Sequence, residues 1–442
     1  MFDTICTLPL PADLFAQAVH PTESIVTVGL SSGHVITYRL PSGEEDEDSG
    51  SNSSPPPPVP GTANGNGPTP IISTFRRSST ASENGLGSID TVWKTKRHSG
   101  SCRCISYNHD GSLCYSGGTD GLVKAFNTET GKVVSKIAIP PDSETGDVDA
   151  PTVLHALSPQ ALLLGTDSGK LYLHDLRQQG ADIQGKAVKF WQPHEDEHVN
   201  SLVPLPVTEA STSGFPKQWV TAGGSTLVVT DLRKGIISTS EDQEAELTTA
   251  ICVQGLKKGG TSVGEKVLVG QGDGVISLWE RGVWGDQDER IVVDRTQSGI
   301  ESMVEVPLEF GKGKLKMNEK LVAAGLEDGA VKFLRVGRNG ILSEWDVRHD
   351  EIEGVVGLDF DVAGRMVTGG GQTIKVWTEA KGVPGGGRQA SKRAMDSDGS
   401  EDDEEEHYDS SDEEDKSKRK KRKRNEGKDK SGGQALNFSG LL

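Results

Sequence analysis

The chain has 442 residues with 55 glycines, only 5% aromatic residues and a formal net charge of −18. This composition predicts many tight turns between short strands and argues against long helices packed around one compact core. No stretch reaches the roughly 20 apolar residues that cross a bilayer, and the first residues lack the basic region of a secretory signal. We expect a soluble, intracellular protein with one large repetitive β domain and tails.

Residues 2–8 alternate between apolar and polar side chains, as a half-buried β-strand does, and stand before the first hairpin. Residues 41–90 then interrupt the β-rich sequence. They begin with an acidic run, continue through a Pro-rich stretch and include Arg76–Ser79, a pattern typical of a basophilic kinase site. Because so little of this segment is apolar, we predict a disordered insertion.

A hairpin unit recurs on both sides of the insertion. Each copy has two β-rich runs joined by a turn that contains glycine, which supplies positive φ at no steric cost. Five copies have the turn glycines Gly33, Gly121, Gly169, Gly274 and Gly329. Two further copies, at 219–233 and 366–377, bring the number to seven. A period of about 40–55 residues with two hairpin strands per unit is typical of four-stranded blades, so we predict an all-β, seven-bladed WD-repeat β-propeller.

The N-terminal strand is predicted to close this ring. Residues 378–389 are rich in Gly and provide no fourth strand for the last blade, whereas residues 2–8 have no other partner. Pairing them with the seventh blade removes two exposed strand edges. The predicted organisation is 1–40, closing strand and start of blade one; 41–90, insertion; 91–378, remainder of the propeller; 379–442, disordered acidic and then basic tail.

The chain has one Trp-Asp dipeptide, Trp345-Asp346, the pair that names a class of propeller repeats. The position of that pair is the end of the third strand, where this chain instead has such residues as Phe126-Asn127. Trp345-Asp346 follows a third strand that ends near Arg335. We therefore predict that it lies on an outer, fourth strand.

In three units a tryptophan precedes a loop histidine by three to five residues. The pairs are Trp93 and His98, Trp191 and His194, and Trp345 and His349. Such a histidine can hydrogen-bond to an aspartate of the adjacent hairpin turn, and His98 with Asp120 is the predicted pair. No Ser, Cys or carboxylate cluster recurs beside these histidines, and no phosphate-binding or hydrolase motif is present. We expect structural histidines, no catalytic residues and no cofactor.

The five cysteines form no Cys-x-x-Cys pair, which favours a reducing compartment. A metal site on Cys102 and Cys104 is the sharper alternative, but alternate residues of a strand share a face as a matter of course. No other Cys or His pair lies nearby in the sequence, so we favour thiols without a metal.

Four segments carry a resemblance to a known family: 13–35, 85–93, 91–104 and 115–133. With the basic C-terminal tail, they closely resemble the fungal Jumonji-interacting WD-repeat proteins, relatives of the animal WD-repeat protein fifty-five. The resemblance implies a non-enzymatic propeller of the nucleus and nucleolus that takes part in ribosomal RNA processing and large-subunit assembly. Its expected partners are proteins of the pre-ribosome, and we expect a monomer within larger complexes that does not bind membranes.

The tail places an acidic run, 401–415, before a basic run, 416–424. The basic residues are Lys416, Lys418, Arg419, Lys420, Lys421, Arg422, Lys423 and Arg424. This density suits a nuclear or nucleolar address and charge-driven binding to RNA phosphates, whereas the alternative is a merely solubilising tail. Ser410 and Ser411 precede acidic residues and are predicted phosphorylation sites of an acid-directed kinase.

The default role of a rigid disc with loops on several surfaces is to hold partners together. A second function remains open because two segments resemble the Asp-x-Arg ending of propellers that bind a ubiquitin-ligase adaptor. They are Asp175-Leu176-Arg177 and Asp231-Leu232-Arg233. Both lack the preceding aromatic residue of that pattern, and such an arginine commonly makes a local ion pair. The alternative is a substrate receptor for a cullin-based ubiquitin ligase, and an enzyme is a third, weaker one.

Overall fold

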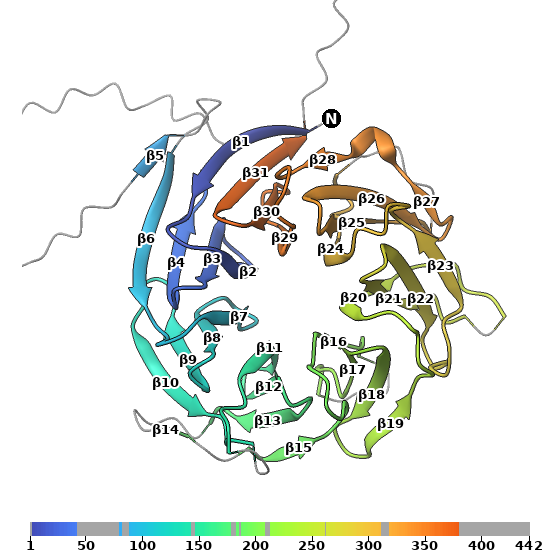
Figure 1. Cartoon of the computed structure of the whole chain (residues 1–442), viewed down its shortest axis with the longest axis horizontal. Helices are drawn as coiled ribbons and strands as arrows, with labels where there is room; N and C mark the ends of the chain where they lie inside the picture. Colours follow the sequence, from blue (N-terminus) through green and yellow to red (C-terminus); the bar gives the residue numbers. More distant parts are fainter. Residues whose placement is uncertain are drawn as a thin grey trace, which may run out of the picture. The chain divides into compact units, whose positions relative to one another are not determined.

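The computed structural model describes residues 2–41, 79–81, 88–142, 146–177, 183–184, 187–207, 213–260, 262–310 and 318–379. Within these residues the strands form seven antiparallel-hairpin sheets that follow one another around a ring (Figure 1). The five predicted turn glycines all have positive φ, between 68° and 80°. The predicted seven-bladed propeller is therefore confirmed.

In the first four blades the strands follow one another from the innermost outward. Blade 1 has β2 (Leu14–Val19), β3 (Ile25–Leu30), β4 (His34–Arg39), β6 (Ser88–Lys96) and β5 (Ser79–Ala81). Blade 2 has β7 (Cys102–Tyr107), β8 (Leu113–Gly118), β9 (Leu122–Asn127), β10 (Val133–Ala138) and β14 (Ile183–Gln184). Blade 3 has β11 (Pro151–Ser158), β12 (Ala161–Thr166), β13 (Leu171–Asp175) and β15 (Lys189–Trp191). Blade 4 has β16 (Ser201–Pro204), β17 (Gln218–Gly223), β18 (Thr226–Asp231) and β19 (Gly235–Thr239).

The remaining three blades complete the ring. Blade 5 has β20 (Leu247–Gln254), β21 (Glu265–Gln271), β22 (Val275–Glu280) and β23 (Glu289–Val292). Blade 6 has β24 (Ile300–Glu305), β25 (Lys320–Leu326) and β26 (Ala330–Val336), with β27 (Gly340–Ile341) and β28 (Val347–Arg348) both paired to β26. Blade 7 has β29 (Gly357–Phe360), β30 (Met366–Gly370), β31 (Thr373–Glu379) and β1 (Phe2–Pro9).

The N-terminal strand closes the ring, as predicted. β1 pairs antiparallel with β31 from Phe2 opposite Glu379 to Pro9 opposite Thr373 (Figure 1). Ile5 and Leu8 of β1 are buried in a cluster that joins blades 7 and 1. The closing strand therefore supplies both the backbone pairing and part of the core at this junction.

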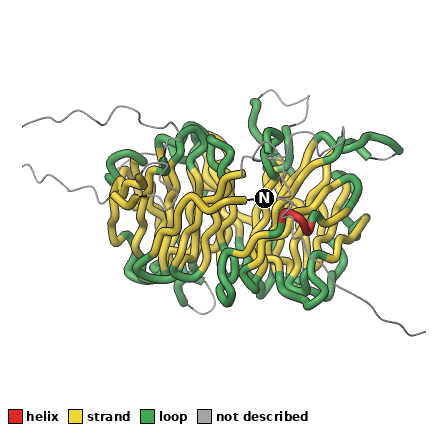
Figure 2. Tube along the Cα trace, turned by 90° about the horizontal axis from the view of Figure 1, so that it is seen from above, coloured by secondary structure: helices red, strands yellow, loops and turns green. Residues whose placement is uncertain are grey.

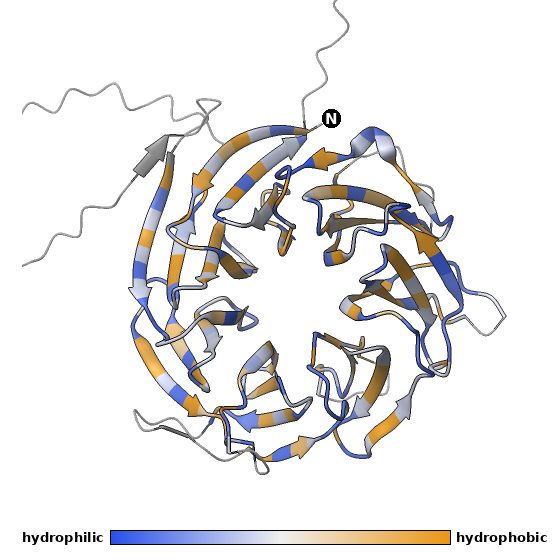
Figure 3. Ribbon diagram, in the orientation of Figure 1, coloured by the Kyte–Doolittle hydropathy of each residue, from blue (hydrophilic) through white to orange (hydrophobic). Residues whose placement is uncertain are grey.

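The hydrophobic core is divided among the junctions between blades. The buried residues group into seven clusters, and each cluster combines strands from two adjacent blades. Apolar residues recur along the strands of every blade (Figure 3). Because each blade is buried on both faces by its neighbours, the disc has no single central core, and its rigidity depends on an unbroken ring.

Two sequence predictions need correction. Strands β5 and β6 lie partly inside the expected insertion 41–90, and Ile89 of β6 is buried. The boundary at residue 90 was therefore wrong, because blade 1 takes its fourth strand from Ser88 onward. The rest of the insertion, at 42–78 and 82–87, and the tail from residue 380 lie outside the described residues.

The Trp-Asp dipeptide does follow the third strand of blade 6, but it does not lie on a continuous outer strand. A 3-10 helix, η1 (Ser343–Trp345), separates β27 from β28. Trp345 is buried, and its ring packs edge-on against Phe333 at 5.7 Å and Phe2 of the closing strand at 6.3 Å. This tryptophan therefore helps to hold β1 in place.

Candidate functional site

The blades present loops on two faces, with the strands between them (Figure 2). The face that we call the upper face has the turns between the second and third strands of each blade and the loops that join successive blades. The lower face has the loops that join first to second and third to fourth strands. The recurring histidines lie at the upper face and the Asp-x-Arg segments at the lower face.

His98 makes the hydrogen bond to Asp120 that the sequence predicts. Its ring is 1% exposed, with Nδ1 2.8 Å from Asp120 Oδ1 and Nε2 2.9 Å from Ser116 Oγ. Burial lowers the pKa of His98, although the Asp120 carboxylate opposes that shift. The imidazole links the loop between blades 1 and 2 to β8 and to the turn between β8 and β9 of blade 2, and both its nitrogens are engaged.

His194 and His349 are buried in the same way but bond to threonines, not to an aspartate. His194 Nε2 lies 3.0 Å from Thr221 Oγ1, and burial lowers its pKa to about 4. His349 Nδ1 lies 2.8 Å from Thr368 Oγ1. The Nε1 of Trp377 donates to the same Thr368 hydroxyl at 2.8 Å. Each of the three histidines thus bonds to a hydroxyl group on the second strand of the blade that follows it: Ser116, Thr221 or Thr368.

These hydroxyl residues were not predicted from the sequence, although the sequence contains a signal for them. Ser116, Thr221 and Thr368 each stand two residues before a glycine: Gly118, Gly223 and Gly370 respectively. A Cβ on Gly118 would lie 2.4 Å from the His98 ring, and one on Gly223 would lie 2.8 Å from the His194 ring. These glycines leave room for the imidazole, so a hydroxyl residue two positions ahead of such a glycine predicts the histidine's partner.

The two neighbouring cysteines of β7 do not share a face. A bulge between Cys102 and Cys104 shifts the register against β8, so that the thiols point toward different blades. A Cβ on Gly29 of blade 1 would lie 2.5 Å from Cys102 Sγ, whereas Cys104 Sγ lies beside Gly117, where Pro151 of blade 3 also packs. Burial raises the pKa of Cys104 to about 12. The expectation that these two alternate residues share a face is therefore wrong.

Neither a metal centre nor a membrane helix is found in the described ranges. Among these residues no group of three or more His, Cys, Asp and Glu side chains is placed to hold a metal ion. No helix there has both the length and the apolar character required to cross a membrane.

The two Asp-x-Arg segments differ in how their arginines are used. Arg177 Nε donates to Asp175 Oδ1 at 2.9 Å, and the bonds from Arg177 lower the pKa of Asp175 to about 2. Asp231 accepts the backbone N–H of Arg233 at 2.8 Å, as Asp175 accepts that of Arg177, but among the described residues it accepts no bond from the Arg233 side chain, and Arg233 is exposed. Within the described residues, no carboxylate lies within 4 Å of that guanidinium. The basic run and the two tail serines lie outside the described residues.

Seven blades of four or five strands, closed by the N-terminal strand and stabilised by buried loop histidines, define a WD-repeat β-propeller. The family model described as "WD domain, G-beta repeat" matches residues 90–127, which span the His98 loop and the hairpin of blade 2.

The chain is 52% identical over 403 residues to WD repeat-containing protein jip5 of Neosartorya fischeri, a match that covers 90% of this chain and 89% of that protein. It is 52% identical over 382 residues to the JIP5 protein of Phaeosphaeria nodorum, which covers 86% and 82% respectively. The jip5 protein of Botryotinia fuckeliana is 48% identical over 383 residues, with the same coverage. The chain belongs to the jip5 family of WD repeat-containing proteins, and the predicted family resemblance is confirmed.

Proposed function

We propose that this protein is a non-enzymatic scaffold in nucleolar ribosome biogenesis, with roles in ribosomal RNA processing and large-subunit assembly. The closed ring is the observation that carries the proposal. Its seven junctions are packed and its recurring histidines are engaged in internal bonds, so the disc offers two loop-bearing faces on a rigid frame. A frame of this kind suits the simultaneous binding of several partners.

The nucleolar location is supported by the sequence of the tail. The basic run, 416–424, matches the composition of a nuclear or nucleolar address and can bind RNA phosphates by charge. The preceding acidic run, 401–415, attracts it at short range, and salt screens this attraction beyond about 8–10 Å. Phosphorylation of Ser410 or Ser411 adds roughly −1.5 to −2 charges each and strengthens this attraction between the acidic and the basic run. We expect Ser410→Ala with Ser411→Ala to slow nucleolar exchange, measured by photobleaching.

Affinity purification of the tagged full chain, followed by identification of the co-purifying proteins and RNA, tests the proposal. The expected result is enrichment of large-subunit assembly proteins together with precursor ribosomal RNA. Enrichment of neither, in a preparation where the tagged chain is intact and nuclear, would rule out the scaffold role.

The Arg233 guanidinium, which no carboxylate of the described residues approaches within 4 Å, favours a second candidate, the substrate receptor of a cullin-based ubiquitin ligase. On that hypothesis, Arg177→Ala with Arg233→Ala abolishes co-purification of the ligase adaptor and leaves the fold intact. Arg295→Ala with Arg338→Ala, which removes two exposed arginines elsewhere, is the matched control. If the adaptor does not co-purify with the wild-type chain, or if the Arg177 and Arg233 changes do not alter its co-purification, only the scaffold function is left.

A further inference from the structure

The lower face has an apolar groove between blades 4 and 5. It combines two adjoining pockets with volumes of about 150 Å³ and 560 Å³, which share Pro206 and Val207. The larger pocket is lined mainly by aliphatic and proline side chains from β16, β20 and the loop after β16. Val207 is 39% exposed, so the groove presents apolar surface to solvent.

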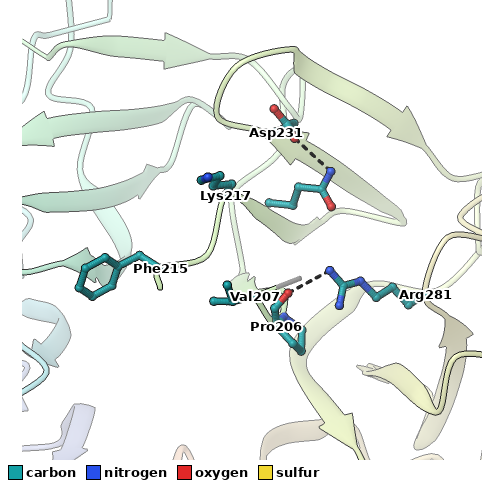
Figure 4. Close-up of a pocket in the computed structure, with 7 residues that line it drawn as sticks. Pro206, Val207, Phe215, Lys217, Asp231 and Arg281 are labelled. Atoms are coloured by element: carbon teal, nitrogen blue, oxygen red, sulfur yellow. Dashed lines mark hydrogen bonds between the residues drawn. The ribbon is translucent and has the colours of Figure 1, made fainter. Parts of the chain in front are cut away.

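Figure 4 shows how the smaller pocket is framed. Lys217 and Asp231 lie on one side, and Pro206, Val207 and Arg281 lie across from them (Figure 4). Arg281 Nη2 donates to the Pro206 carbonyl at 2.9 Å, and its Nη1 is paired with a glutamate of blade 5, Glu265. Arg281 therefore fixes the pocket wall and is not available to a ligand.

Three other cations at this site have no such engagement. Lys217 lines the pocket, and its carbonyl accepts the N–H of Leu232, which places it beside the turn that contains Arg233 and Lys234. Asp231 Oδ1 accepts the N–H groups of Arg233 and Lys234 at 2.8 Å and 3.1 Å. In the described part of the chain, no carboxylate lies within 4 Å of the side-chain nitrogens of Lys217, Arg233 or Lys234.

Asp231 forms no ion pair within 4 Å with these cations, although the Lys234 ammonium still attracts its carboxylate. Its Oδ1 is held by the two backbone N–H groups, and its Oδ2 accepts a bond from Gln218 Nε2 at 3.0 Å (Figure 4). The carboxylate thus shapes the turn that projects Arg233 and Lys234 outward. In a protein whose net charge is −18, three cations that no carboxylate of the described residues approaches within 4 Å, beside an apolar groove, form a surface complementary to an acidic ligand.

We propose that this groove, with Lys217, Arg233 and Lys234 at its rim, binds an acidic peptide segment of a partner protein. An apolar side chain of the peptide occupies the groove between Pro206 and Ile251, and its Asp or Glu carboxylates pair with the three cations. The inference deepens the scaffold function and rests on it, because it assigns one binding surface and the chemistry of its partner.

The lining favours a peptide over RNA. Aliphatic and proline side chains offer no flat ring on which bases stack. The one aromatic ring of the pocket, Phe215, already packs edge-on against His109 at 5.6 Å.

The test is to pan a phage-displayed library of random dodecapeptides against the full chain and to measure enriched peptides by fluorescence anisotropy. The expected consensus places an apolar residue beside several acidic ones. Lys217→Glu with Arg233→Glu and Lys234→Glu is expected to weaken binding at least about tenfold, because three exposed ion pairs become repulsive. Lys132→Glu with Arg295→Glu and Arg338→Glu, which changes the net charge equally at exposed sites elsewhere, is expected to have little effect.

A consensus without acidic residues, no enriched peptide, or equal binding to both triple variants would overturn the inference. Oligouridine that displaces the peptide and binds more tightly would assign the surface to RNA instead. Thermal melts of both triple variants show whether each retains the fold. If the peptide binds as expected but the wild-type chain purifies without ribosomal precursors, the scaffold function fails and the binding site stands.

Discussion

The closing strand β1 gives the most quantitative prediction of the structure. Ile5 and Leu8 are 4% and 3% exposed, and both pack in the cluster between blades 7 and 1. A buried Ile or Leu replaced by Ala typically costs about 2–5 kcal/mol, so Ile5→Ala with Leu8→Ala should lower the free energy of unfolding by at least about 4 kcal/mol. That is a large fraction of the roughly 5–15 kcal/mol that stabilises a folded domain.

Thermal unfolding followed by circular dichroism measures this effect. For a large domain, about 1 kcal/mol corresponds to a Tm shift of roughly 2 °C, which predicts a decrease of about 8 °C or more. Asp3→Ala changes an exposed residue of the same strand and should alter Tm by about 1 °C or less. Deletion of residues 1–9 should have a still larger effect. A double variant with the same Tm as the wild type would refute closure of the ring by β1.

Three further predictions concern the histidines and the tail. Gly118→Ala should destabilise the fold by about 3 kcal/mol, because the new methyl group displaces the His98 ring, whereas Gly340→Ala, with no atom within 4 Å, should stay within about 0.5 kcal/mol in denaturant titrations. Since the pKa of His194 is about 4 when folded and about 6.5 when unfolded, its stabilisation is complete above pH 6.5 and is lost as pH falls toward 4, by up to about 3 kcal/mol. His194→Asn should therefore show a shallower loss of stability from about pH 7 to about pH 5, and an unchanged slope would contradict this assignment. Deletion of 416–424 should disperse the protein from nucleoli in fluorescence microscopy. If the deletion variant stays in nucleoli, the propeller and not the basic run determines the localisation.

Much of the fold was predictable because the hairpin is a local structure. A turn that requires positive φ needs glycine, so Gly33 and its four counterparts mark the blades whatever the surrounding sequence does. The closing strand was also predictable. The alternating N-terminal segment has no neighbouring strand and the last blade has no fourth strand, so pairing the two supplies both with a partner. The fourth strand of blade 1 was harder to delimit, since Ser88–Asp90 follow a polar segment and carry little strand signal of their own.

The candidate site was less predictable because it depends on contacts between distant strands. His98 with Asp120 could be paired from the known geometry of such loops, but the Ser116 hydroxyl is identified only once β8 is placed beside the loop. The bulge that turns Cys102 and Cys104 apart has no mark in the sequence. The cations at the lower groove lie on two loops, and only strand pairing brings Lys217 beside Arg233.

The central claim, a scaffold role in large-subunit assembly, is tested most directly by pulse labelling of ribosomal RNA after conditional depletion of the protein. We expect depletion to cause large-subunit precursor RNA to accumulate and mature large-subunit RNA to decrease relative to small-subunit RNA. The full chain should restore both, and the closure variant Ile5→Ala with Leu8→Ala should not. Normal maturation of both RNAs in depleted cells would contradict the claim.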